Sequence, residues 1–165
     1  KLINPLLIIL FAVALRLIPH MPNFAPISAM ALFGGVYLNK KYALLVPLIA
    51  MFVSDVFLGF YTTMPFVYGS FLVTGLIGLW LRKHKNSAKI IAGALFSSLL
   101  FFIITNFGVW LVGEMYTKDI LGLFNSYYFA LPFFRNTILG DLFYVALFFG
   151  SYELARYFLT RKNFA

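Results

Sequence analysis

Long apolar segments follow one another along almost the whole chain, and short stretches that carry most of the charged residues separate them. Of the 165 residues, 62% are hydrophobic and only 11% are charged, whereas soluble domains carry about 25% charged residues. A small soluble domain has no core large enough to bury this much apolar surface. We therefore expect one all-α domain within a lipid bilayer, where helices satisfy their own backbone hydrogen bonds.

Six apolar segments have the character of membrane helices, for which about 20 residues span the hydrocarbon layer. They cover residues 2–18, 26–38, 42–60, 66–81, 88–112 and 132–158. The second is short and ends near Gly34 and Gly35, so we expect a tilted or re-entrant helix that packs within protein. Residues 119–131 are apolar and rich in aromatic side chains, which favours an interfacial helix before the last span.

The basic residues predict the orientation of this six-helix transmembrane bundle. Ten of the thirteen lie at the chain ends and in the loops on the same side: Lys1, Lys40, Lys41, Arg82, Lys83, Lys85, Lys89, Arg156, Arg161 and Lys162. The opposite loops hold only Lys118. Because cytoplasmic loops are enriched in Lys and Arg, both termini are expected in the cytoplasm. The net charge of +8 then reflects topology and contact with anionic lipid, not nucleic-acid binding.

Polar residues interrupt the apolar segments, above all in the run 132–141, Pro-Phe-Phe-Arg-Asn-Thr-Ile-Leu-Gly-Asp. Charged residues inside a membrane helix are unfavourable by about 3 kcal/mol each on insertion scales, and they usually face a cavity or a partner. In the predicted topology nearly all such residues lie in the outer half of the bundle. The candidate ligand-binding residues are Arg16, His20, Asn23, Asp55, Asn106, Trp110, Tyr127, Arg135, Asn136 and Asp141.

These residue types suit a small polar or anionic molecule with a planar part. Arginine presents a planar fork to carboxylate or phosphate groups, and asparagine pairs with both donors and acceptors. We assign Arg16 and Arg135 to the anionic or carbonyl end of the ligand. Asn106 and Asn136 would hydrogen-bond its ring, on which Trp110 and a loop tyrosine would stack.

The two membrane aspartates leave several interpretations open. In the binding interpretation, Asp55 or Asp141 orients an arginine or accepts an N–H group of the ligand. Alternatively, both aspartates pair with Arg16 and Arg135 as buried ion pairs that fix helix register. An intramembrane enzyme that uses Asp55, His20 and Asp141 is a further alternative. So is an assembly protein whose charges are all internally paired.

The usual signatures of metal and nucleotide chemistry are missing from the sequence. It has no Cys and only two His, which lie on opposite sides of the predicted membrane, so we expect neither a metal site nor a cofactor. The pair Gly34-Gly35 is not followed by the Lys and Ser or Thr of a phosphate-binding loop. Any use of ATP would therefore require a partner protein.

Three stretches of the N-terminal half resemble substrate-binding S components of energy-coupling factor (ECF) vitamin transporters. They are residues 22–35 (Pro-Asn-Phe-Ala-Pro-Ile-Ser-Ala-Met-Ala-Leu-Phe-Gly-Gly), 45–51 (Leu-Val-Pro-Leu-Ile-Ala-Met) and 54–59 (Ser-Asp-Val-Phe-Leu-Gly). Residues 104–110 (Ile-Thr-Asn-Phe-Gly-Val-Trp) and 130–141 resemble a group of uncharacterised bacterial membrane proteins that are similar to those S components. The resemblance covers residues 16–150.

This resemblance implies a multi-pass protein of the bacterial cytoplasmic membrane, with six helices and an outward pocket formed by the first loop and the later helices. It also implies a transmembrane coupling protein with two ATPases, against which the S component topples to release a captured vitamin. S components dock through small residues spaced by three on the first helix. Here Ala25 and Ala29 have that spacing but open the second segment, whereas Ala12 and Ala14 do not match.

Overall fold

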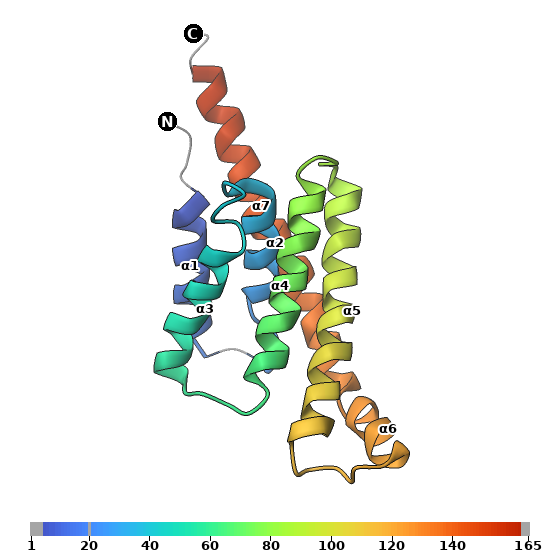
Figure 1. The fold of residues 1–165 in the computed structure, drawn as a ribbon. Helices are drawn as coiled ribbons and strands as arrows, with labels where there is room; N and C mark the ends of the chain where they lie inside the picture. Colours follow the sequence, from blue (N-terminus) through green and yellow to red (C-terminus); the bar gives the residue numbers. More distant parts are fainter. Residues whose placement is uncertain (1–4, 20, 163–165) are drawn as a thin grey trace.

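The computed structural model describes residues 5–19 and 21–162, and these residues form helices and loops without any strand (Figure 1). The helices are α1 (Pro5–Leu17), α2 (Ile27–Tyr37), α3 (Leu45–Leu58), α4 (Met64–Leu81), α5 (Ser87–Val112), α6 (Ile120–Tyr128) and α7 (Leu131–Lys162). The predicted all-α class is confirmed, and each predicted segment matches one helix to within four residues at either end.

Within the described residues, three helices are long and apolar enough to cross a membrane: α4, α5 and residues Leu131–Thr160 of α7. The 26 residues of α5 extend about 39 Å, which exceeds a hydrocarbon layer of about 30 Å. Large apolar side chains also cover much of the outer surface, including Phe57 at 74% and Leu10 at 63% exposure. Water does not tolerate so much exposed apolar surface, so these features indicate a membrane protein.

The first three helices are shorter than a full span. The segment expected over 42–60 is helical only in α3, because residues 40–44 form turns and Gly59 ends the helix with φ of 97°. With 13, 11 and 14 residues, α1, α2 and α3 extend only about 16–21 Å each. Each of these helices therefore needs its neighbours, or a thinner apolar layer, to be accommodated in a bilayer.

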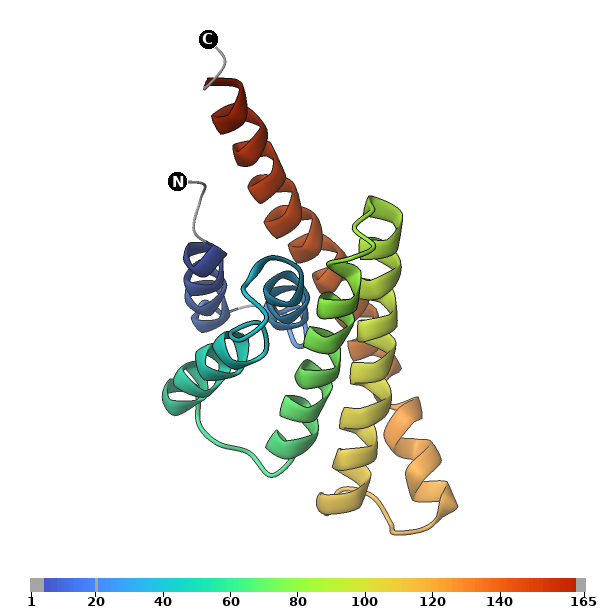
Figure 2. The same ribbon diagram turned by 45° about the horizontal axis from the view of Figure 1, so that its top comes forward.

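Helix α2 lies in the centre of the bundle, as its predicted packing within protein requires (Figure 2). Residues 27–36 are all buried, and α2 contacts α1, α3, α4, α5 and α7. On the α7 side, the ring of Phe33 packs against Phe148, Phe149 and Tyr152. A short helix that no lipid reaches is thus the core around which the longer helices assemble.

Helices α2 and α4 touch backbone to backbone where glycines face one another. A Cβ atom on Gly35 would lie 2.5 Å from the carbonyl oxygen of Gly75 and 2.6 Å from Cα of Gly78. Just beyond this contact, Arg82 donates from Nε (3.1 Å) and Nη2 (2.7 Å) to the carbonyl oxygen of Gly35, and also to that of Leu38. These bonds satisfy carbonyl groups that the end of α2 leaves without helical partners.

The two ends of the bundle differ in charge. The start of α1, the end of α7 and the α2–α3 and α4–α5 loops lie together at one end, here called the basic end (Figure 1). Its loops carry Lys40, Lys41, Arg82, Lys83 and Lys85. The opposite end, here called the α6 end, comprises the α1–α2, α3–α4 and α5–α6 loops together with α6.

One carboxylate joins three elements at the basic end. Glu153 of α7 accepts hydrogen bonds from the hydroxyl of Tyr37 on α2 and from Nζ of Lys85 in the α4–α5 loop. It also lies 3.9 Å from the guanidinium group of Arg156, the i+3 pairing that the sequence permits. This cluster adds polar links to the glycine contact, so the basic end is closed and tightly joined.

Candidate functional site

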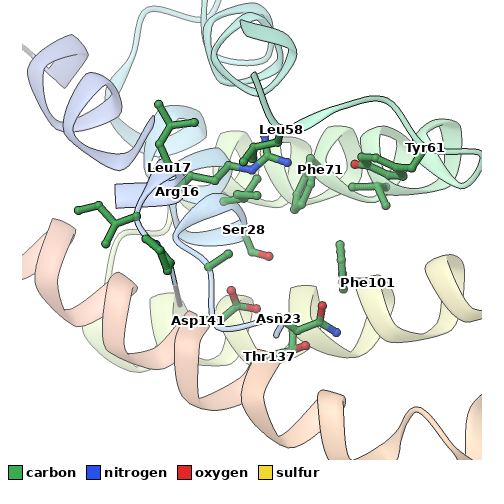
Figure 3. A pocket seen from close by; sticks show the side chains of 15 residues that line it. Arg16, Leu17, Asn23, Ser28, Leu58, Tyr61, Phe71, Phe101, Thr137 and Asp141 are labelled. Atoms are coloured by element: carbon green, nitrogen blue, oxygen red, sulfur yellow. The ribbon is translucent and has the colours of Figure 1, made fainter. Parts of the chain in front are cut away.

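A cavity of about 540 Å³ lies between the helices, and Figure 3 shows the side chains that line it. It lies in the half of the bundle nearest the α6 end, because the α1–α2 and α3–α4 loops border it. Its walls come from the ends of α1 and α3, the loops before α2 and α4, the first turn of α2, the N-terminal halves of α4 and α7, and the middle of α5. Three candidate residues line it: Arg16, Asn23 and Asp141. The fold thus brings residues more than 120 positions apart in the sequence to one space.

Arg16 reaches the cavity from the last turn of α1, and α3 holds its guanidinium group. Nη2 lies 2.5 Å from Oδ1 of Asp55, while Nη1 donates to the Ser54 hydroxyl and to the Met51 carbonyl oxygen at 3.2 Å. The other carboxylate oxygen of Asp55 accepts from the Tyr68 hydroxyl at 2.6 Å. Asp55 is fully buried and lies behind Arg16, so it orients the arginine and balances its charge.

Asp141 lines the cavity from α7, and its surroundings differ from those of Asp55. The carboxyl group is almost fully buried, with 3% of the residue exposed. Its Oδ2 atom accepts from the Ser98 hydroxyl at 2.6 Å, and Ser28 also hydrogen-bonds to it. Among the described residues no Lys or Arg lies within ion-pairing distance of Asp141. Its partners are therefore neutral hydroxyl groups.

Aromatic rings form much of the remaining wall. Phe71 of α4 and Phe101 of α5 stack with ring centroids 5.4 Å apart, and Tyr61 lines the cavity from the α3–α4 loop (Figure 3). Burial raises the pKa of the Tyr61 hydroxyl, and the Asp55 carboxylate raises it further. This hydroxyl therefore stays protonated at neutral pH. The cavity combines flat apolar surface with a few polar groups, as small-molecule sites usually do.

A second, smaller cavity of about 200 Å³ adjoins the first. Both cavities are lined by Asn23, Val67, Phe101 and Thr137. Asn106 lines only the smaller one, and its amide nitrogen donates to the Phe102 carbonyl oxygen at 2.8 Å within its own helix. Asn106 can therefore offer a ligand its amide oxygen and the second proton of its amide nitrogen.

Two aromatic candidates lie outside both cavities and hold α5 and the α6 segment together. The indole nitrogen of Trp110 donates to the carbonyl oxygen of Thr117 at 3.0 Å, across the loop between the two helices. The hydroxyl of Tyr127 donates to the carbonyl oxygen of Ile103 at 2.9 Å. Both contacts anchor the α6 segment to α5, and neither side chain lines a cavity.

Two polar candidates of α7 also lie outside the cavities. Asn136 donates to the carbonyl oxygen of Pro22 at 3.1 Å, which ties the first loop to α7. Arg135 is exposed and lines neither cavity. His20, the remaining candidate, lies outside the described residues.

The predicted docking residues occupy the interior of the bundle. Ala25 lines the larger cavity, and Ala29 is 1% exposed within the core. A partner helix would reach Ala29 only after α2 and its neighbours separated. The spacing of these two small residues serves close packing around α2 in this conformation.

The described residues contain no group of three His, Cys, Asp or Glu side chains that could hold a metal ion. Residues 1–162 match the model described as "Family of unknown function (DUF6580)". The chain belongs to the DUF6580 family. Comparison with curated proteins and with solved structures finds no match.

Several cavity residues of this DUF6580 member were not among the candidates predicted from the sequence: Ser28, Tyr61, Phe71, Phe101 and Thr137. Thr137 could have been predicted from the sequence as a site residue, because it lies four residues before Asp141 and therefore on the same helix face. Ser28 and Tyr61 could not have been predicted in this way, because a serine in an apolar helix and a tyrosine at a membrane boundary are both common. Only the packing of α2 against α7 brings Ser28 to Asp141.

Proposed function

We propose that this chain is a membrane-embedded substrate-binding protein that captures a small water-soluble nutrient, vitamin-like or heterocyclic, for uptake. The observation that carries the proposal is the cavity of about 540 Å³, with Arg16 held in place, a buried Asp141 and stacked aromatic walls. Known small-molecule sites occupy about 300–1,000 Å³ and join apolar walls to a few oriented polar groups. A structural protein with internally paired charges would need no such space.

The cavity faces the outside in this proposal. The basic end carries nine of the twelve described Lys and Arg residues, five in its loops and four in the adjoining parts of α5 and α7. Positively charged segments of this kind are retained in the cytoplasm. The α6 end, where the cavity lies, then faces outward. The proposed topology has six spans and cytoplasmic termini in a bacterial inner membrane, with α6 at the outer interface.

Transport would require a partner, because the sequence contains no nucleotide-binding motif. By resemblance to S components, that partner is a transmembrane coupling protein with two ATPases. Release of the captured molecule would follow a movement of the whole bundle or of α2 and its neighbours, because the glycine contact between α2 and α4 closes the basic end.

Capture of a nutrient can be tested with purified protein in lipid nanodiscs. The protein is incubated with a water-soluble bacterial metabolite extract and washed, and the retained compounds are identified by mass spectrometry. We expect at least one compound to be retained by the parent and lost in Thr137→Phe, whose added ring would fill the junction of the two cavities.

Leu139→Phe is the matched control, because Leu139 lies on the same helix but is 49% exposed. Val67→Phe, which fills the same junction from α4, serves if Thr137→Phe does not fold. Retention of the same compounds by the parent and by both cavity-filling variants, or of none by the parent, contradicts the proposal.

A further inference from the structure

We infer that the molecule captured in the cavity carries a positively charged nitrogen with at least one N–H group, which binds to Asp141. The inference rests on the proposed capture function and defines the chemical class of its substrate. That class is a small aromatic amine or a cationic heterocycle. An anionic ligand, which the two arginines predict from the sequence, fits the observed arrangement less well.

The charge balance of the cavity is the first argument. Arg16 and Asp55 form a pair 2.5 Å apart without net charge, and Arg135, the other candidate arginine, is exposed and lies outside the cavity. Asp141 has no cationic partner among the described residues. A buried carboxylate is strongly unfavourable unless a positive group meets it or it takes up a proton. A protonated amine supplies the missing charge from the ligand.

The hydrogen bonds around Asp141 are the second argument. An ionised carboxylate has about four lone-pair positions, and the hydroxyl partners it has here are Ser98 and Ser28. The Ser98 oxygen also lies 3.0 Å from the Ala94 carbonyl oxygen, and its one proton can serve only one of these acceptors at a time. Asp141 therefore retains capacity to accept bonds, and N–H groups of a cation bond to carboxylates with charge assistance.

The surrounding rings are the third argument. Phe71, Phe101 and Tyr61 line the same cavity, and aromatic faces attract cations most strongly where water is excluded. The same rings give a planar ligand an apolar surface. A flat molecule with a cationic nitrogen is thus favoured by the carboxylate and by the rings together.

Three probes of nearly equal size test the inference: benzylammonium, benzyl alcohol and benzoate. Their affinities for purified protein in phosphatidylcholine nanodiscs are measured by calorimetry at neutral pH. We expect the parent to bind benzylammonium about tenfold more tightly than the other two, the advantage of one charge-assisted bond. Asp141→Asn should abolish the preference, while Glu114→Gln, which removes an exposed carboxylate at the same end, should retain it.

Each other outcome overturns the inference in a distinct way. If benzyl alcohol or benzoate binds the parent as tightly as benzylammonium, the cavity captures small molecules but does not select cations. If Asp141→Asn keeps the preference, another group recognises the charge. If none of the probes binds the parent, both the proposed capture site and the inferred substrate class are contradicted.

The source of the ammonium group can be identified in the same system. Nanodiscs that contain phosphatidylethanolamine present the same chemistry as a lipid headgroup. Weaker binding of benzylammonium in these discs would show that the lipid headgroup occupies the site, which would contradict a soluble aromatic amine as the captured molecule. Unchanged binding supports it with a soluble amine as its source.

Discussion

Helices α2 and α4 meet closely at the basic end of the bundle and separate at the α6 end. At the basic end, Gly35 faces Gly78 with no space for a Cβ atom, and Arg82 holds the last carbonyl groups of α2. At the α6 end, Ser28 of α2 and Phe71 of α4 line a cavity of about 540 Å³. The same pair of helices thus closes one side of the protein and borders the cavity on the other.

The largest expected effect on stability is at the cavity wall, at the α6 end. Asp55→Ala removes the carboxylate from a guanidinium group that is only 11% exposed, and loss of one member of a buried pair is unfavourable by about 3–5 kcal/mol. We expect a corresponding loss of thermal stability in detergent micelles. The double variant Arg16→Met with Asp55→Leu should recover most of it. A double variant no more stable than Asp55→Ala would show that the pair is not the source of the loss.

The next largest effect on stability is expected at the basic end, where α2 packs on α4. In Gly78→Ala the new Cβ would lie 2.5 Å from the carbonyl oxygen of Leu32 and 2.9 Å from Cα of Gly35. The two helices must therefore shift apart, and we expect the free energy of unfolding to fall by about 2 kcal/mol. Gly69→Ala in the same helix meets nothing within 4 Å and should stabilise α4 by about 0.5–1 kcal/mol. Thermal unfolding of the two variants measures the difference. Equal stabilities would contradict close packing of α2 on α4.

A smaller, local effect is expected in α6. Asp119 accepts from the backbone N–H of Gly122 and from the Thr117 hydroxyl, and both bonds lower its pKa. A lowered pKa contributes stability at pH values above the ordinary carboxyl range, and this contribution is lost as the pH falls through the folded-state value. Hydrogen exchange, corrected for intrinsic rates, should show several-fold less protection of α6 at about pH 3 than at about pH 6.

The control for this local effect is Asp119→Asn, because asparagine caps helices as well as aspartate does but does not titrate in this range. Protection of α6 in this variant should not depend on pH. Amides in the middle of α5 should keep their protection throughout, since they belong to the bundle. A parallel loss in α5 would indicate global unfolding instead.

The smallest effect is expected for Arg135→Ala. Its side chain is exposed and lines neither cavity, so stability should change by no more than about 0.5 kcal/mol. Capture of metabolites should equal that of the parent. Arg16→Ala, the same substitution inside the cavity wall, should lose capture. Loss of capture in Arg135→Ala would show that α7 turns toward the cavity when ligand binds.

The long helices and the buried second helix were predictable from the sequence, because apolar length and Pro or Gly boundaries are local properties. Helix ends in the first half were less accurate, as the shorter α3 shows. The turns formed by residues 40–44 set where α3 begins, and Gly59 sets where it ends. A run of apolar residues does not reveal where the backbone stops being helical.

The candidate site was predictable only in part. Arg16, Asn23 and Asp141 line the larger cavity, whereas the choice of Asp55 as the partner of Arg16 depends on how α1 packs on α3. Arg135 could have been placed from helix phase alone. It precedes Asp141 by six residues, or about 600°, which leaves the two side chains roughly 120° apart around α7. Residues from other helices, such as Ser28 and Phe101, depend on tertiary packing that no local pattern contains.

The shortness and complete burial of α2 have a consequence for biogenesis. A helix of about 16 Å is too short to remain in the bilayer on its own, and residues 27–36 are buried by helices on either side of it in the chain. We therefore expect α2 to settle only after α4, α5 and α7 have been synthesised and inserted. Membrane integration of this chain is then a late, cooperative event. If the chain is truncated before α7, we expect α2 and the neighbouring N-terminal helices not to insert stably in the membrane.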